Sequence, residues 1–222
     1  MAPGWLTILA WTYLAVCSGC AAIIAWDIFA GGRRQPMGVM NAVYPITALY
    51  FGPLALVFYT RWGRAGRSGG RERPWWVMMA TEVSHCGSGC VLGDVVSEWL
   101  VFALGLTIAG ITIGPEYIGD YALALALGII FQYFAIAPMR GLGVRDGLRA
   151  AAKADTISLT FFEIGLFGWM AIMMFVLFPA PNQLMPNSAA FWFLMQIGMM
   201  IGYATSWPAN VWLVRRGIKI PM

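Results

Sequence analysis

The chain has 222 residues, of which 60% are hydrophobic and 11% are charged, with a formal net charge of +4 at pH 7. Soluble domains carry about 25% charged residues, so this composition excludes a water-soluble protein. The basic residues stand in the gaps between apolar runs, where membrane orientation signals belong, and this argues against nucleic-acid binding. Four cysteines are too few for a disulfide framework.

Apolar runs long enough to cross a bilayer, which takes about 20 residues, follow one another along the chain. Glycine and proline clusters separate them. The predicted fold class is therefore all-α: a polytopic helical bundle in the membrane, with about six transmembrane helices. The predicted spans are Trp5–Ala30, Met37–Thr60, one crossing within Trp75–Ile113, Tyr117–Met139, Thr156–Phe178 and Ala190–Val214.

Orientation is predicted from lysine and arginine, which gather in cytoplasmic loops. Twelve of the 14 basic residues follow the second, fourth and sixth spans, which puts these loops and both termini in the cytoplasm and leaves Arg33 and Arg34 outside. A seven-span alternative, with two crossings in Trp75–Ile113, would put one basic loop outside, and we disfavour it. The predicted location is the cytoplasmic (inner) membrane of a prokaryote. The twelve are Arg61, Arg64, Arg67, Arg71, Arg73, Arg140, Arg145, Arg149, Lys153, Arg215, Arg216 and Lys219.

Two parts are expected. Residues 1–73 hold two N-terminal transmembrane helices and a basic cytoplasmic loop, and residues 74–222 form a four-helix membrane domain. The third predicted span differs from the others because ionisable groups and thiols recur on it at every fourth position. On a helix such residues form one stripe, and the only histidine, His85, adjoins it. The stripe consists of Glu82, Cys86, Cys90, Asp94 and Glu98.

An ionisable group inside a membrane costs about 2.5–3.5 kcal/mol, so the carboxyl groups of the stripe need partners. The predicted spans contain no lysine or arginine. The groups must therefore be protonated, hydrated or neutralised by a bound cation. Glu163 of the fifth span is placed to approach Glu82 or Asp94. Together these residues form a predicted cation pathway of Glu82, Asp94, Glu98 and Glu163.

Sulfur and imidazole ligands together suit Cu(I) or Zn(II). The first span carries two further cysteines three residues apart, so their thiols share a face near its midpoint. We predict that they converge with the stripe on a metal site formed by His85, Cys86, Cys90, Cys17 and Cys20. The alternative is that the cysteines are small packing residues and that His85 bonds a neighbouring helix. Whether His85 lies at the midplane or at the cytoplasmic mouth stays open.

The string from His85 to Asp94, His-Cys-Gly-Ser-Gly-Cys-Val-Leu-Gly-Asp, resembles the signature of a prokaryotic membrane family, domain of unknown function 4396. The segments Phe162–Met170 and Ala137–Gly141 are similar to its later parts. The resemblance covers Pro74–Arg215 and implies a polytopic membrane domain centred on His85. It implies no particular activity.

Three functions are carried forward. The first is a small permease or exporter for copper or zinc, with a His/Cys site and a carboxylate track. The second is a subunit that holds haem (through His85) or a quinone, or that has a structural role in a membrane complex. The third is a proton-coupled carrier of an organic solute that uses the carboxylates alone. An enzyme is not expected. The expected partners are the lipid bilayer and further copies of the chain in a homo-oligomer, or a membrane complex, without nucleic acid.

Overall fold

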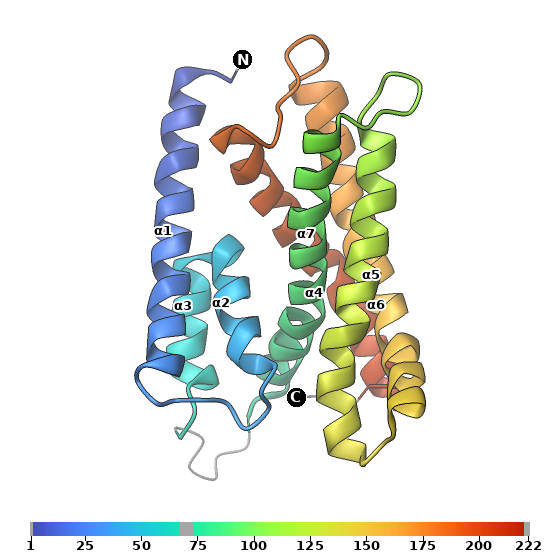
Figure 1. Cartoon of the computed structure of the whole chain (residues 1–222). Helices are drawn as coiled ribbons and strands as arrows, with labels where there is room; N and C mark the ends of the chain where they lie inside the picture. Colours follow the sequence, from blue (N-terminus) through green and yellow to red (C-terminus); the bar gives the residue numbers. More distant parts are fainter. Residues whose placement is uncertain (1, 67–72, 220–222) are drawn as a thin grey trace.

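The computed structural model describes residues 2–66 and 73–219, apart from the side chains of residues 137–140. The described residues form helices and contain no β-strand, which confirms the predicted all-α class. In chain order the elements are α1 (Gly4–Phe29), α2 (Met40–Phe51), α3 (Pro53–Phe58), the π-helical turn η1 (Tyr59–Gly63), α4 (Trp75–Leu104), α5 (Ile113–Arg140), α6 (Val144–Ile172), the π-helical turn η2 (Met173–Leu177) and α7 (Ala189–Arg215) (Figure 1).

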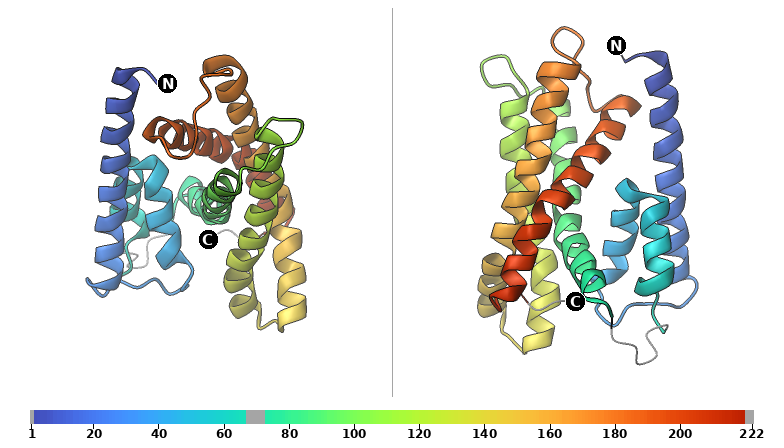
Figure 2. Two further views of the ribbon diagram at one scale, coloured as in Figure 1. Left: turned by 45° about the horizontal axis from the view of Figure 1, so that its top comes forward. Right: turned by 180° about the vertical axis from the view of Figure 1, so that it is seen from behind.

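Four stretches of the described helices are long and apolar enough to cross a membrane: Gly4–Phe29, Trp75–Leu104, Ile113–Ile136 and Val144–Leu177. The molecule is therefore a membrane protein. The α1–α3 unit stands on one side and α5 and α6 on the other, with α4 between them (Figure 2). Helix α7 crosses the bundle diagonally, and its beginning lies beside α1, where Tyr13 and Phe193 meet at a centroid distance of 5.6 Å. Within its apolar window α4 is 56% buried, against 28–39% for the other three. It is the central helix, and its side chains mostly meet protein instead of lipid.

The second predicted span, Met37–Thr60, is not one crossing helix. Its residues form α2 and α3, which fold back on each other as a hairpin about half as deep as α1 (Figure 1). The 12 residues of α2 rise about 18 Å, whereas the hydrocarbon core is about 30 Å thick. The reversal is at Gly52, which has a φ of +52°, followed by Pro53, which cannot continue α2 because it has no N–H.

A chain reversal inside a membrane is tolerated where protein supplies partners for the freed backbone groups. Here the carbonyl of Tyr50 accepts a hydrogen bond of 3.0 Å from the Tyr13 hydroxyl on α1, and the carbonyl of Leu49 accepts one from the Gln196 amide on α7. A side chain at Gly52 would place its Cβ 2.9 Å from the sulfur of Cys17. The turn is thus held from both sides by neighbouring helices.

The hairpin changes the topology of the chain. Because it returns to the end from which it came, the start of α1 and the end of α7 lie at opposite ends of the molecule (Figure 1). The prediction that both termini share a side of the membrane is not confirmed. Arg33 and Arg64 were predicted to lie on opposite sides of the membrane, but in the structure they lie at the same end of the molecule. Nε of Arg33 is 3.4 Å from one carboxyl oxygen of Asp27, and Nε of Arg64 is 3.0 Å from the other.

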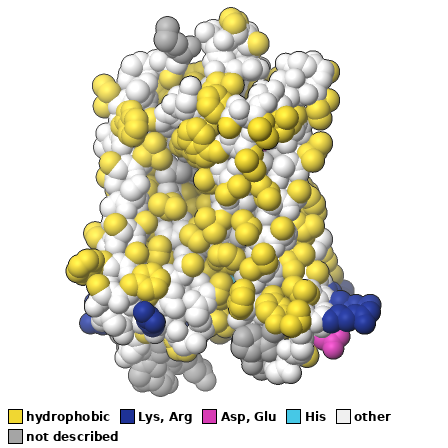
Figure 3. Space-filling view, in the orientation of Figure 1, with side chains coloured by type: hydrophobic (Ala, Val, Ile, Leu, Met, Phe, Trp, Pro, Cys, Tyr) yellow, Lys and Arg dark blue, Asp and Glu magenta, His cyan; other side chains and the backbone are white. Residues whose placement is uncertain are grey.

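The basic side chains consequently gather at one end. In the space-filling view the visible lysine and arginine side chains all lie at the bottom, below a surface that is mainly hydrophobic and uncharged (Figure 3). Asp27 of α1 also accepts a 2.8 Å hydrogen bond from the Tyr59 hydroxyl. It thereby connects the end of α1 to the segment that follows α3. We refer to this end of the molecule, which holds Arg33 and Arg64, as the basic end.

Gly52→Ala tests the hairpin turn. The added Cβ meets the Cys17 sulfur, and a left-handed backbone costs a non-glycine residue about 1–2 kcal/mol. We expect a lower midpoint of thermal unfolding for the detergent-purified protein, with partial recovery when Cys17→Ala removes the sulfur. Gly19→Ala is the matched control, since no atom lies within 4 Å of its Cβ position. Equal midpoints for the two single variants would contradict the turn described here.

Candidate functional site

The stripe on α4 is buried as a whole. Glu82, Cys86, Cys90, Asp94 and Glu98 are each at most 1% exposed. Small residues beside the stripe explain how these five side chains are buried. A Cβ at Gly89 would lie 2.7 Å from Cα of Gly128, and one at Gly93 would clash with the backbone of Ala124. The missing side chains let α5 approach α4 closely, and this approach keeps lipid away from the stripe.

At the basic end a lysine reaches the stripe. Lys219 follows α7, and its Nζ lies 3.2 Å from Oε1 of Glu82 and 3.7 Å from Oδ1 of Asp155 on α6, with both of its side-chain partners buried. It also donates hydrogen bonds to Ser158 Oγ at 3.0 Å and to Asn210 Oδ1 at 2.9 Å. The sequence analysis counted Lys219 among the cytoplasmic loop residues and expected no basic partner for the carboxyl groups. That expectation is wrong for Glu82.

The charge of Lys219 is stabilised by its surroundings. Burial alone lowers the pKa of an amine, but the carboxylate of Glu82 and the neighbouring acidic groups outweigh burial and raise the pKa of Lys219 above its usual value. Since the raised pKa lies above that of the unfolded chain, the lysine stays protonated, and its stabilising contribution is lost only when the pH rises through the folded-state pKa.

The middle of the stripe carries the sulfur and imidazole groups. The Cys86 sulfur lies 3.1 Å from the Ser158 hydroxyl of α6. The His85 ring faces Phe131 of α5 at a centroid distance of 6.2 Å, and Gln132 lies beside it. Neither ring nitrogen of His85 forms a hydrogen bond of normal geometry with the described residues. His85 is thus a buried and unsatisfied polar group.

Further from the basic end the stripe meets carboxyl groups of two other helices. Glu163 of α6 interacts with Cys90 and Asp94, so of the two positions predicted for Glu163, the structure has it beside Asp94. Asp120 of α5 interacts with both Asp94 and Glu98.

Three acidic residues of this arrangement were missed by the sequence analysis. Asp120 and Glu116, both near the beginning of α5, are only 0% and 8% exposed. Asp155, on α6, was not singled out at all. Their spacing held a weak signal: Glu116 and Asp120 are four residues apart on one helix, so they share a face. We call the combined set the carboxyl row; it consists of Glu82, Asp155, Glu163, Asp94, Asp120, Glu98 and Glu116.

The carboxyl row spans much of the bilayer thickness and has few positively charged partners. Glu98 follows Glu82 by 16 positions on α4, a rise of about 24 Å, which is most of the thickness of a bilayer core. Among the described residues Lys219 alone forms ion pairs with the row. Within the part of the chain that the structure describes, both carboxyl oxygens of Asp94, Glu98, Asp120 and Glu163 lack a hydrogen bond of normal geometry. Because isolated buried carboxylates are very costly, this part of the row must bind protons or another cation.

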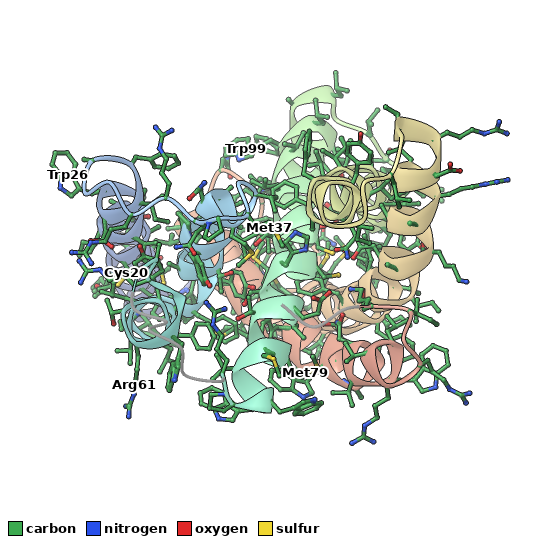
Figure 4. The ribbon with its side chains drawn as sticks, turned by 90° about the horizontal axis from the view of Figure 1, so that it is seen from below. Cys20, Trp26, Met37, Arg61, Met79 and Trp99 are labelled. Atoms are coloured by element: carbon green, nitrogen blue, oxygen red, sulfur yellow. The ribbon has the colours of Figure 1, made fainter. Side chains whose placement is uncertain are left out.

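The predicted metal site is not assembled. Cys17 contacts the hairpin turn at Gly52, and Cys20 packs in the apolar core between α1 and the hairpin. Cys86 and Cys90 belong to the separate core of the α4–α7 bundle. Figure 4 labels Cys20 within the α1–α3 unit, away from α4. In the described part of the chain no three histidine, cysteine, aspartate or glutamate side chains are grouped to hold a metal ion.

The fold and the row define a class: a helical membrane domain built around a central helix that carries buried ionisable groups. The family model for this chain covers the same unit. The family described as Domain of unknown function (DUF4396) matches residues 75–219, well over half of the chain, and the chain belongs to that family. This confirms the resemblance found in the sequence. The match begins at the first residue of α4 and ends at Lys219. No curated protein and no solved structure matches.

Lys219→Met tests the ion cluster at the basic end. Removing one partner of a buried pair leaves uncompensated charge and typically costs about 3–5 kcal/mol, so we expect a clear drop in the thermal midpoint. Adding Glu82→Gln to the same chain should recover part of the loss, because one orphaned carboxylate is then gone. Lys153→Met, at an exposed position of α6, is the control. A midpoint for Lys219→Met equal to that of the control would refute the buried cluster.

Proposed function

We propose that this protein is a proton-coupled membrane carrier, in which protons move along the carboxyl row of the α4–α7 bundle. The observation that carries the proposal is the row itself: its carboxyl groups are buried, and most of them have no hydrogen bond of normal geometry to the described residues. One group of them lies at Lys219 and a second around Asp94, with His85, Cys86 and Ser158 between the two groups. Intramembrane carboxyl groups of this kind typically mark ion pathways and proton relays.

Adjacent carboxyl groups favour protons over metal ions as the cargo of the row. Two carboxylates in contact cannot both ionise easily, so neighbours hold a proton between them. Asp94 with Glu163 and Glu98 with Asp120 are such neighbours. A proton taken up by Asp94 can pass to Glu163 or Asp120, and from Asp120 to Glu98. Soft metals, in contrast, need sulfur and imidazole ligands grouped around one point.

At the Lys219 cluster, in contrast to the rest of the row, the carboxyl groups are paired with a positive charge. Two carboxylates, Glu82 and Asp155, share one lysine, so the cluster contains one acidic group more than it has cations. A proton that arrives at Glu82 weakens the attraction to Lys219 without leaving the amine bare, because Asp155 stays beside it. The cluster can therefore accept and release protons at the basic end while Lys219 remains charged.

The orientation follows from the positive-inside rule. We propose that the basic end is cytoplasmic, that α1, α4, α5, α6 and α7 cross the cytoplasmic membrane of a prokaryote, and that α2 and α3 form a re-entrant hairpin. The start of α1 is then outside the cell and the end of α7 inside. The Lys219 cluster faces the cytoplasm, and Glu116 lies toward the outer side.

Single introduced cysteines distinguish this topology from six complete spans. Arg34 and Asn187 are both exposed. In the proposed topology a membrane-impermeant maleimide labels Asn187→Cys in intact cells, but labels Arg34→Cys only after the membrane is permeabilised. Six crossings would expose both positions outside. Labelling of Arg34→Cys in intact cells would therefore overturn the re-entrant hairpin in the membrane.

Proton movement is tested in liposomes that contain the purified protein and a pH-sensitive dye. With a potassium diffusion potential as driving force, we expect proton uptake above that of empty liposomes. Asp94→Asn should reduce this uptake by about tenfold or more, because an amide keeps the shape of the group but cannot relay a proton. Asp146→Asn, exposed at the start of α6, should leave it unchanged. Equal uptake by both variants would refute the row as the route.

The competing functions are tested on the same preparation by elemental analysis and an absorption spectrum. Copper or zinc near one equivalent, lost in His85→Ala, would favour metal handling through His85, Cys86 and Cys90. A Soret band would favour a haem subunit. The proton-carrier proposal expects neither.

A further inference from the structure

A cavity of about 210 Å³ separates the hairpin from the bundle. Side chains of four helices form its walls. They include Tyr44, Thr47 and Phe51 of α2, Leu54 of α3, Ala80 and Ser84 of α4, and Tyr203 of α7. None of the described residues that line it is charged. The cavity exists because the hairpin turns back instead of filling the space beside α4.

The walls are aromatic and fixed in place. Phe51 and Tyr203 meet edge to face at a centroid distance of 5.0 Å, and the Tyr203 hydroxyl donates a 3.0 Å hydrogen bond to the carbonyl of Ala80. Thr47 and Ser84 add hydroxyl groups to this apolar lining. A preformed apolar cavity with a few polar groups is the usual form of a small-molecule site.

The cavity opens toward the lipid. Leu54 of α3 lines it and is 72% exposed, so the mouth lies on the apolar outer surface of the hairpin. An uncharged apolar molecule concentrates in the bilayer and can reach this mouth without crossing water. A charged or strongly hydrated solute has no such route and no partner inside.

Tyr50 connects the cavity to the stripe on α4. Its side chain is fully buried, and its hydroxyl forms no hydrogen bond of normal geometry with the residues that the structure describes. The hydroxyl packs against Gly87 of α4, where a Cβ would lie 3.5 Å from the oxygen. It interacts with Thr47 and Tyr203, which line the cavity, and with Cys86 and Cys90 of the stripe. The Tyr50 phenol therefore lies between the cavity and the stripe on α4.

We propose that the cavity binds a small, flat, uncharged aromatic molecule that bears a hydroxyl or carbonyl group, and that this is the solute of the carrier, with Tyr50 linking the residues that line the cavity to the stripe. The assignment of this molecule as the transported solute rests on the proposed function; its binding does not. The aromatic walls favour ring stacking, the hydroxyl groups select a polar substituent, and the volume lies below the roughly 300–1,000 Å³ of pockets for larger ligands.

The test uses 1-naphthol as the probe and naphthalene as its analogue without the hydroxyl, with binding to the detergent-purified full chain measured by equilibrium dialysis. We expect saturable binding of 1-naphthol at one site per chain, and binding of naphthalene weaker by about tenfold, because a site with polar groups discriminates against a ligand that leaves them unpaired. Ala80→Trp fills the cavity and should abolish binding. Leu100→Trp, exposed on α4, should not.

Variants of the polar groups keep the test valid if Ala80→Trp does not fold. Thr47→Val together with Ser84→Ala should weaken 1-naphthol binding several-fold and leave naphthalene binding unchanged. Equal affinity for both ligands in all variants, or a phospholipid that must be stripped from the cavity before 1-naphthol binds, would overturn the proposal in favour of a lipid-chain site.

The coupling of 1-naphthol binding to proton movement is tested separately, by measuring proton uptake. Tyr50→Phe should retain 1-naphthol binding but lose the change in proton uptake that 1-naphthol causes in liposomes. Specific binding without any proton uptake would refute the carrier function alone. Proton uptake that depends on Asp94, without specific 1-naphthol binding, would refute the cavity assignment alone.

Discussion

The cost of burying carboxyl groups away from water is the constraint on which this structure depends. A helix that carries Glu82, Asp94 and Glu98 on one face cannot present that face to lipid. It takes the central position, and the neighbouring helices are arranged around its polar side. Glycines on α4 make the closest of these contacts possible, because α5 can approach only where side chains are missing. Polar groups of α5 and α6 are brought to the stripe by the same approach.

The two ends of the row satisfy this constraint in different ways. At the basic end a lysine from beyond α7 folds into the bundle and pairs with Glu82 and Asp155. Toward the other end the described residues supply carboxyl groups but no positive partner, and neutrality must come from bound protons or another cation. The bundle is therefore asymmetric along its axis, with a fixed positive charge at one end and exchangeable positive charge along the rest. Directional carriers need such a difference between their ends.

The sequence predicted what lies within one helix and missed what depends on contacts between distant segments. The stripe on α4 and its small-residue face were predictable, because helical periodicity alone places them. The pairing of Lys219 with Glu82 joins residues far apart in the chain, and nothing local indicates it. Burial of Asp120 likewise depends on the close approach of α5 to α4. The hairpin had a local signal in Gly52-Pro53, but the apolar run containing it is long enough to cross once, and run length does not show a reversal of direction.

The hairpin also shows how the chain divides its tasks. The family match begins with α4, so the carboxyl row lies wholly within the family domain, whereas α1, α2 and α3 lie outside the match. The cavity is formed by both parts, since Thr47 and Phe51 come from the hairpin and Ser84 and Tyr203 from the bundle. The proposed proton route lies in the family domain and faces the proposed binding cavity, which the N-terminal helices complete. Under this proposal, changes in the hairpin can alter which solute binds without disturbing the ionisable groups, since these groups lie on α4, α5 and α6. Tyr50 is the exception to this separation, because its hydroxyl interacts with the stripe.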